Sequence, residues 1–160
     1  MSSDTIEKQI ENLDVGVHAI RAAVEALSDD AFLGTLGNWT SRDIVAHLIG
    51  WNRYSVRGAQ QLLMGKLPFY DIDPGKDYCH VNARLVAEYP AENRTELLAD
   101  HEKAAHELAE FLRSISEEQW SGGTGVLLEG EELTIRQNVD WLIEDHHHHT
   151  AQIRDLAKGS

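Results

Sequence analysis

The sequence contains a single cysteine, Cys79, and only three prolines in 160 residues. One cysteine cannot form a disulfide within the chain, so the fold does not depend on crosslinks and we expect a reducing compartment. Few prolines mean few forced interruptions of the backbone, which favours long helices. With 42% hydrophobic residues the chain is long enough to close its own core, and we expect one domain over residues 1–160.

Positive charge is also scarce. Fourteen Lys and Arg residues stand against 27 Asp and Glu residues, which gives a formal net charge of −13. The sequence has no block of five or more basic residues that would grip phosphates. From this balance we expect neither nucleic acid nor an anionic membrane surface as a partner, because both would repel the chain. A small-molecule substrate is the partner that we expect instead.

Long apolar runs and a targeting segment are lacking too. The longest uninterrupted apolar stretches are only a few residues, far short of the roughly 20 that span a bilayer. The first residues, Met1 to Asp4, carry neither the basic region nor the apolar region of a secretory signal. We therefore expect a cytoplasmic protein that does not enter a membrane.

The sequence is rich in helical periodicity. Hydrophobic residues recur at steps of three and four, which predicts helices at about residues 4–27, 39–64, 76–88, 93–116 and 134–158. The start of the second segment, Trp39-Thr40-Ser41-Arg42-Asp43, has the hydroxyl and the acidic residue that open a helix. The stretch 121–125 contains three glycines and is expected to be a linker, because it lacks the Gly-Lys-Ser/Thr ending of a phosphate loop.

Four long helices and one short one, joined mostly by compact links, indicate an all-α fold. The expected architecture is an up-down four-helix bundle with an additional short helix. Facing helices of such bundles commonly project metal ligands into the core.

Nine histidines, four of them consecutive at 146–149, are the most unusual feature of the composition. At 100° per residue, His146 and His149 fall near the apolar side of the last helix, whereas His147 and His148 point to solvent. Asp145 lies four residues before His149, which is the spacing by which one helix gives two ligands to one ion.

A third ligand would come from another helix. His47 lies at the edge of the apolar stripe of the second helix, one turn before Trp51. Two imidazoles and one carboxylate would leave coordination positions open for water or substrate, as in catalytic metal sites. On spacing alone, the alternative is a run of surface histidines on an acidic helix. His101 and His106 are five residues apart on a charged helix and are expected to be solvated.

Two motifs resemble the DinB-like superfamily. In the segment 39–51 a tryptophan and an aspartate precede His47, and a second tryptophan follows one turn later, which looks like the second-helix signature of that family. The tail 149–153, His-Thr-Ala-Gln-Ile, resembles the end of the family's last helix. Residues 81–86 and the final helix are most similar to the ClbS/DfsB branch. The resemblance covers about residues 5–157 and implies the DinB/YfiT-like metalloenzyme fold.

The resemblance also implies a divalent metal, held by one histidine of the second helix and by a pair four residues apart on the last helix. Carried over to this sequence, these ligands are His47, Asp145 and His149. Many members have histidine where this chain has Asp145, and some thiol-dependent relatives have a carboxylate there; His146 is the alternative ligand. Zn²⁺ or Ni²⁺ is the expected ion, with a low-molecular-weight thiol as a further cofactor.

The known activities of the superfamily divide into two kinds. Some members resemble metal-dependent thiol transferases or isomerases, in which the metal lowers the pKa of the thiol. ClbS-like members protect the producing cell by hydrolysing an electrophilic cyclopropane. We therefore expect action on a small electrophilic molecule by thiol transfer or hydrolysis, of the detoxification or self-protection type, and we assign no catalytic residue. The alternative is a non-catalytic bundle that sequesters a small molecule or serves as a dimeric interaction module.

Three residues are candidates for a substrate pocket. Trp51 and Tyr54 flank the line of His47, and Asn82 lies on the short helix. Aromatic residues at this spacing also commonly pack in a core, so both interpretations remain open for Trp51 and Tyr54. A homodimer is expected, because relatives often pair through their bundle helices.

Overall fold

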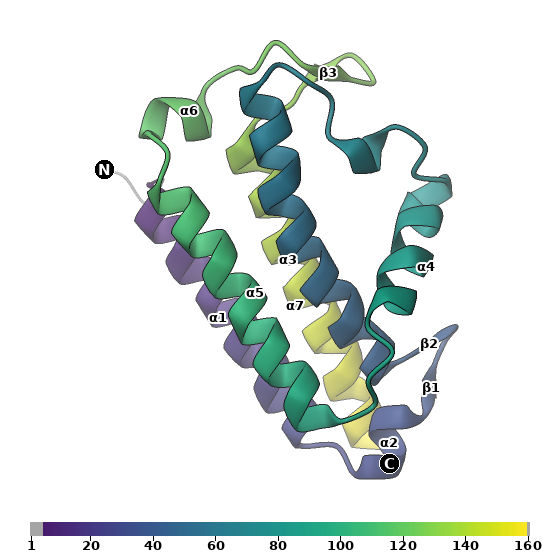
Figure 1. The fold of residues 1–160 in the computed structure, drawn as a ribbon. Coiled ribbons are helices and arrows are strands. Elements are labelled where there is room, and N and C mark those ends of the chain that lie inside the picture. Colours follow the sequence, from purple (N-terminus) through teal and green to yellow (C-terminus); the bar gives the residue numbers. More distant parts are fainter. Residues whose placement is uncertain (1–4, 160) are drawn as a thin grey trace.

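The structure, a computed structural model, describes residues 5–159 and is built almost entirely of helices (Figure 1). Four long helices form the bundle: α1 (Ile6–Glu25), α3 (Ser41–Leu63), α5 (Arg94–Arg113) and α7 (Ile135–Gly159). The additional short helix is α4 (Cys79–Glu88), which follows two 3-10 turns, η1 (Phe69–Asp71) and η2 (Lys76–Tyr78). The all-α prediction is confirmed, and the helix ends agree with it to within a turn. The predicted start of the first helix at Asp4 lies outside the described residues.

Two short helices and two hairpins were not predicted. The helices are α2 (Asp29–Leu33) and α6 (Glu117–Ser121), and the antiparallel strand pairs are β1 (Thr35–Leu36) with β2 (Trp39–Thr40) and β3 (Leu127–Leu128) with β4 (Glu131–Glu132). Each has only two to five residues, which is too short to leave a hydrophobic period in the sequence.

Successive long segments alternate in direction, with α4 as the third of five passes (Figure 1). The bundle helices α3 and α5 therefore run parallel to each other, and so do α1 and α7. Near the start of α1, the Gln9 amide donates a hydrogen bond to the carbonyl oxygen of Arg136 at the start of α7 (2.9 Å). At the opposite end, the Arg94 guanidinium at the start of α5 binds the carbonyl oxygens of Val24 and Leu27 (3.0 and 2.6 Å). Helix α7 thus packs between α1 and α3.

The start of α3 is held by reciprocal hydrogen bonds between Thr40 and Asp43. The Thr40 hydroxyl accepts from the Asp43 backbone N–H (3.1 Å), and the Asp43 carboxylate accepts from the Thr40 N–H (3.0 Å). The predicted start of this helix is therefore confirmed, with Thr40 as its N-cap residue. The guanidinium of Arg42 binds the same carboxylate and the carbonyl oxygen of Ala91. These contacts fix where α3 begins and so which side chains it turns inward.

The core has two large apolar clusters, one at each end of the bundle. Polar side chains lie between them on α3 and α7: Asn52 and Ser55 on α3, His146 and Thr150 on α7, all buried. Buried polar groups need partners, and Ser55, Asn52 and Thr150 each donate to the carbonyl oxygen four residues earlier on their own helix. The bundle therefore carries a polar layer at mid-height, where a site can be built.

Glycines on α3 let the segment 67–88 pack closely against it. A Cβ on Gly50 would lie 2.3 Å from the Leu85 side chain of α4, and one on Gly58 would lie 2.5 Å from the Tyr70 ring. Both contacts are shorter than atoms tolerate, so the absence of side chains at these two positions allows the approach. A small third cluster of Tyr70, Val81 and Leu85 forms beneath α4 as a result.

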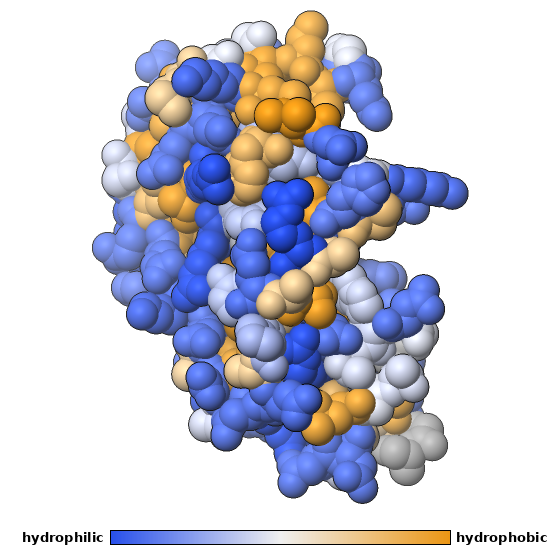
Figure 2. All heavy atoms as spheres, turned by 45° about the vertical axis from the view of Figure 1, so that its right-hand side comes forward, coloured by the Kyte–Doolittle hydropathy of each residue, from blue (hydrophilic) through white to orange (hydrophobic). Residues whose placement is uncertain are grey.

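The face seen in Figure 2 is mostly hydrophilic, and hydrophobic side chains gather at its upper end. At that end α3 finishes and β3 lies (Figure 1), and the exposed apolar residues there include Leu63, Met64 and Leu127. Within residues 5–159, every helix is too short or too polar to pass through a lipid bilayer.

Candidate metal centre

Helices α3 and α7 bring the three predicted ligands to one point. Helix α3 turns His47, Trp51 and Ser55 to the same side, because steps of four residues return to the same face of a helix. Helix α7 packs against this face and presents Asp145 and His149, again four residues apart. Positions 98 residues apart in the sequence therefore become neighbours.

The ligand atoms of His47, Asp145 and His149 all lie within 4.8 Å of one another. The Nε2 of His47 is 2.9 Å from Oδ2 of Asp145, and the Nε2 of His149 is 3.3 Å from Oδ1 of the same carboxylate. Both imidazoles are buried, and the carboxylate is about one-third exposed (34%). Two imidazole nitrogens and a carboxylate oxygen form a donor set that suits Zn²⁺ or Ni²⁺.

The partners of the two Nδ1 atoms show whether the Nε2 atoms of these imidazoles are oriented to bind a cation. The Nδ1–H of His149 donates to Oε1 of Gln152 (2.7 Å), which leaves the Nε2 lone pair for a metal. The Nδ1 of His47 is buried without a hydrogen-bond partner. The ring of Trp39 packs on both imidazoles, with centroid distances of 4.9 Å to His47 and 6.3 Å to His149. The donor set and the orientation of His149 therefore fit a divalent cation, and sequence reasoning did not assign Trp39 or Gln152 to the site.

The charges in the cluster are set by Asp145. Burial alone would raise the pKa of Asp145, but its hydrogen bonds and ion pairs with His149 and His47 hold that pKa well below the usual range. Burial lowers the pKa of His47 despite the neighbouring carboxylate. For His149 the contact with Asp145 outweighs burial, and its pKa is raised. At neutral pH the cluster thus holds an ionised carboxylate beside a neutral His47, and His149 would release its proton when a cation binds.

His146, the alternative ligand, faces away from this cluster. Its Nδ1–H donates to the carbonyl oxygen of Leu142 (2.8 Å), and its Nε2 lies 3.0 Å from Nε2 of His101, with the two rings stacked at 14°. Since the Nδ1 of His146 carries the proton, His101 must donate from Nε2. Burial lowers the pKa of His146 to about 4 and the pKa of His101 well below its usual value, so both rings are neutral.

The expectation that His101 is solvated is wrong, because its side chain is buried. His101 lies between Leu97 and Ala105 at four-residue steps, on the face of α5 that packs into the bundle. That spacing was visible in the sequence but was outweighed by the charged neighbours of His101. His106 is exposed, as predicted.

The helical phase predicted for the run of four histidines is confirmed. His146 and His149 are buried, and His147 and His148 are exposed. Steps of three and four residues place the first and last of the run on the inner face, while the middle two face solvent.

A cleft of about 470 Å³ opens beside the cluster and shares His47 and Asp145 with it. Trp51 and Asn82, two of the predicted pocket residues, line the cleft, and the Trp51 indole N–H donates to Asn82 Oδ1 (2.8 Å). Tyr54 is not among the lining residues. Its hydroxyl instead donates to Glu88 (3.0 Å) on α4.

Sequence reasoning missed most of the opposite wall of the cleft. Tyr70, Asp71 and Tyr78 come from the two 3-10 turns between α3 and α4, and Trp141 comes from α7. The Tyr78 hydroxyl donates to Asp71 Oδ1 (2.6 Å). The connector between α3 and α4 has no regular period, so its side chains could not be placed from periodicity; its several aromatic residues were the available signal.

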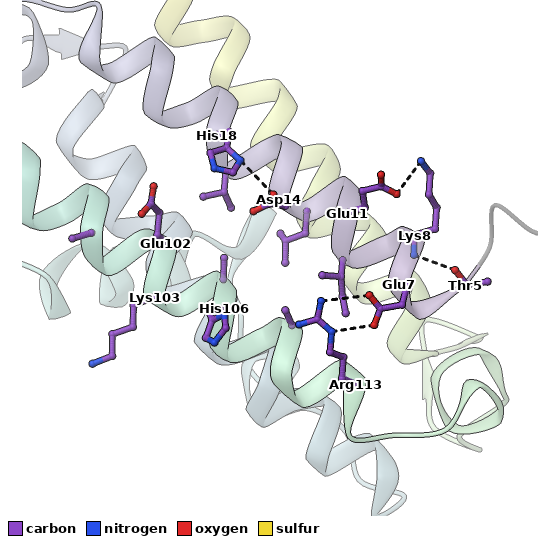
Figure 3. Close-up of a pocket in the computed structure, with 16 residues that line it drawn as sticks. Thr5, Glu7, Lys8, Glu11, Asp14, His18, Glu102, Lys103, His106 and Arg113 are labelled. Atoms are coloured by element: carbon purple, nitrogen blue, oxygen red, sulfur yellow. Dashed lines mark hydrogen bonds and ion pairs between the residues drawn. The ribbon is translucent and has the colours of Figure 1, made fainter.

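A wider groove of about 1050 Å³ runs between α1 and α5 (Figure 3). Its charged side chains pair along the rim, for example Arg113 with Glu7 (3.0 Å) and His18 with Asp14 (3.4 Å). In the part of the chain that the structure describes, the only group of three metal-type ligands is the one between α3 and α7. The α3–α7 cleft is therefore the candidate site for chemistry.

Solved structures share this fold over nearly the whole chain. DfsB, described as a sibling lethal factor precursor, has a TM-score of 0.80 at 16% identity, with 99% of this chain and 98% of that chain covered. The colibactin self-resistance protein ClbS, in complex with double-stranded DNA, has a TM-score of 0.78 at 13% identity, with 99% and 98% covered. A mycothiol-dependent maleylpyruvate isomerase has a TM-score of 0.71 at 16% identity, with 92% of this chain but 60% of that chain covered. No match was found among the curated proteins.

The complex of ClbS contradicts one expectation from the sequence. An acidic net charge was expected to exclude nucleic acid as a partner, yet ClbS has the same fold and was solved with double-stranded DNA. The exclusion was wrong because net charge is a sum over the whole surface, whereas phosphates respond to the charges of the surface that they meet.

A family model agrees with the motifs that suggested the resemblance. The model described as DinB superfamily matches residues 12–153, a range that includes His47, Asp145 and His149. The structures of ClbS and DfsB support the same fold at TM-scores of 0.78 and 0.80. The chain belongs to the DinB superfamily, and its fold is ClbS/DfsB-like.

Proposed function

We propose that this protein is a metal-dependent enzyme that acts on a small electrophilic molecule in the cleft between α3 and α7. The observation that carries the proposal is the convergence of His47, Asp145 and His149, within 4.8 Å, at the wall of a cleft of about 470 Å³. A pocket of this size is typical of sites for small molecules. The expected ion is Zn²⁺ or Ni²⁺.

When bound, a divalent cation would lower the pKa of a thiol or a water molecule and supply a nucleophile at neutral pH. The residues of the chain have separate tasks. His47 offers a neutral nitrogen, His149 would give up its proton to a cation, and Asp145 offers a charge. Gln152 orients the ring of His149 through its Nδ1–H. Trp51 is held by Asn82 and gives the substrate an apolar wall that excludes water.

The relatives by fold support two versions of this chemistry. The isomerase depends on mycothiol, which supports a low-molecular-weight thiol as cofactor. ClbS is a self-resistance protein against colibactin, which supports a protective role such as detoxification, by hydrolysis or by thiol transfer. In either version the substrate is an electrophile and the reaction takes place beside His47.

Metal analysis of three proteins tests the metal centre. Wild type, His47→Ala and His147→Ala are purified without a polyhistidine tag, loaded with Zn²⁺ or Ni²⁺, passed through a desalting column and measured by elemental analysis. We expect about one ion per chain in wild type and in His147→Ala, and a loss of that ion in His47→Ala. His147 is the matched control because it belongs to the histidine run but is exposed. If His47→Ala retains the ion, the histidine run binds it alone and the proposed centre is wrong.

The non-catalytic alternative is separated by turnover. A bundle that only sequesters a small molecule would bind an electrophile stoichiometrically, whereas an enzyme would consume many equivalents in a screen of thiols and electrophiles. We also propose that the protein is a single domain that acts in the cytoplasm as a homodimer. Sedimentation equilibrium of the purified chain would test the dimer.

The DNA complex of ClbS favours double-stranded DNA as a second candidate ligand. Fluorescence anisotropy of a labelled duplex across a salt series tests it. Binding that weakens steeply as salt rises would support a phosphate-contacting surface. No anisotropy change at low salt and micromolar protein would reject this candidate and leave the small-molecule function in place.

A further inference from the structure

The cleft beside the metal centre has an unusual charge balance. Four of its lining residues are carboxylates, Asp71, Asp77, Glu144 and Asp145, and none of the residues that line it is lysine or arginine. Asp71 is buried, and its hydrogen bond is to the neutral hydroxyl of Tyr78 rather than to a cation. Asp77 and Glu144 are exposed at the cleft. The lining therefore attracts positive charge and repels negative charge.

Aromatic rings form the apolar part of the same lining. Trp51 meets Tyr70 and Tyr78 edge to face, with centroid distances of 5.0 and 5.7 Å. Trp141, with 50% of its surface exposed, lies on the α7 side of the cleft. The faces of tryptophan and tyrosine rings attract cations through their quadrupoles. Carboxylates interleaved with aromatic rings are thus suited to an organic cation.

The residues that bring these groups together are held in a costly backbone conformation. Asp77 and Tyr78 are adjacent, are not glycine, and both have positive φ (53° and 61°). This left-handed conformation orients the Tyr78 ring to Trp51 and its hydroxyl to Asp71. Such strain tends to persist where the surrounding structure requires it, often at a binding site. In the same cleft, His47 has a buried Nδ1 that lacks a partner, a polar group left for a ligand.

We propose that the substrate of this cleft carries a positively charged group, an ammonium or a guanidinium, on a small apolar frame. The cation lies among Asp71, Glu144 and the faces of Trp51 and Tyr78, and the reactive part of the molecule lies toward His47. This inference rests on the proposed function and deepens it by naming the class of substrate. Anionic substrates are disfavoured by the same groups.

In the presence of EDTA, three isosteric probes test the charge preference without involving the metal chemistry. Choline, 3,3-dimethylbutan-1-ol and 3,3-dimethylbutanoate share a branched head and differ chiefly in charge, and the quaternary nitrogen of choline cannot coordinate a metal. Binding is followed by tryptophan fluorescence, since Trp51 and Trp141 line the cleft, and by ligand-observed NMR. We expect choline to bind about tenfold more tightly than the neutral alcohol, and the carboxylate to bind least.

Variants locate the effect. Asp71→Asn and Glu144→Gln should each reduce the preference for choline over the alcohol by about threefold to tenfold, since each removes one facing charge. Asp73→Asn is the matched control, because Asp73 lies in the same connector, is exposed and is outside the lining. Asn at position 71 can still accept the Tyr78 hydrogen bond, and circular dichroism checks that the fold is kept.

Equal affinity for choline and the alcohol, or a preference that survives both Asp71→Asn and Glu144→Gln, would overturn the proposal. The measurements are made in EDTA and again after loading with Zn²⁺. If His47→Ala retains bound metal but choline preference is observed in EDTA, the metal centre fails and the cation cleft stands. If metal binding depends on His47 but choline is not preferred over the alcohol, the metal centre stands and the proposed cationic substrate is wrong.

Discussion

The Nδ1–H of His149 donates to Oε1 of Gln152 at 2.7 Å, three residues later on α7. This hydrogen bond leaves Nε2 of His149 to face Asp145, where a cation would take the place of its proton. Gln152 therefore belongs to the candidate metal centre as the residue that orients His149, without offering a ligand atom itself.

Replacing Gln152 by alanine should weaken metal binding without removing any ligand. Loss of the orienting partner lets the His149 ring rotate or change tautomer, and we expect the affinity for Zn²⁺ to fall about 10-fold to 100-fold. Competition with a chromophoric chelator measures the affinity. Gln137→Ala, an exposed substitution on the same helix, is the control. Equal affinities for the two variants would mean that the ring is held by packing alone.

The buried pair of His101 and His146 should make the stability of the protein depend on pH. The unfolded chain binds protons at these positions near pH 6.5, whereas burial lowers the pKa of His146 to about 4 in the fold and holds the pKa of His101 well below its usual value. The stability is thus complete above about pH 6.5 and is lost as pH falls toward 4, by about 3 kcal/mol for His146 alone.

Urea unfolding between pH 7 and 4.5 measures this loss. His101→Leu removes one of the two neutral imidazoles and keeps a similar volume, so the free energy of unfolding should fall less steeply with decreasing pH. His106→Leu is the control on the same helix, because His106 is exposed and should leave the slope unchanged. A slope that is the same in wild type and His101→Leu would contradict neutral burial of His101.

Gly58 should not tolerate even alanine. The new Cβ would lie 2.5 Å from the ring of Tyr70, so the ring and the connector that carries it must move. We expect a loss of about 1 to 3 kcal/mol in the free energy of unfolding and a change in the fluorescence of Trp51, which packs on Tyr70. Gln60→Ala, exposed on the same helix, should have little effect. Unchanged stability and fluorescence would show that the connector packs more loosely than described.

The helix that carries His47 should depend on its first hydrogen bonds. Thr40→Ala removes the hydroxyl that accepts from Asp43, and we expect the free energy of unfolding to fall by about 1 kcal/mol. Thr95→Ala, an exposed substitution in the first turn of α5, is the matched control and should change it by less than about 0.5 kcal/mol. Thermal and urea unfolding together provide the measurement. If the free energy of unfolding falls less in Thr40→Ala than in the control, the start of α3 is stabilised by its other contacts instead.

Much of the bundle and the core of the site could be predicted from the sequence because both follow helical geometry. A period of 3.6 residues places His146 and His149 on the inner face of the last helix and His147 and His148 on its outer face. It also sets Asp145 one turn before His149. The place of His47 opposite them required the resemblance as well, because no local pattern says which helix packs against which. The cluster that His47 forms with Asp145 and His149 depends on how α3 and α7 pack together.

The rest of the site depends on segments without a period. Tyr70, Asp71 and Tyr78 are placed by two 3-10 turns, close approach to Gly58 and two left-handed residues, none of which periodicity reveals. His101 shows a different failure. Its spacing was that of a core residue, but the charges beside it in the sequence suggested solvent, and in a helix adjacent residues face different directions.

The separation of His47 and Asp145 in the sequence determines when the candidate site can form during synthesis and folding. Ninety-eight residues separate them, and α7 is the last of the described helices. During synthesis α1, α3 and α5 emerge first, but none of them can hold a cation without the two groups on α7. An ion that joins α3 to α7 would bind only after α7 has packed against α3. It would therefore stabilise the packing of α7 and favour the folded chain by mass action.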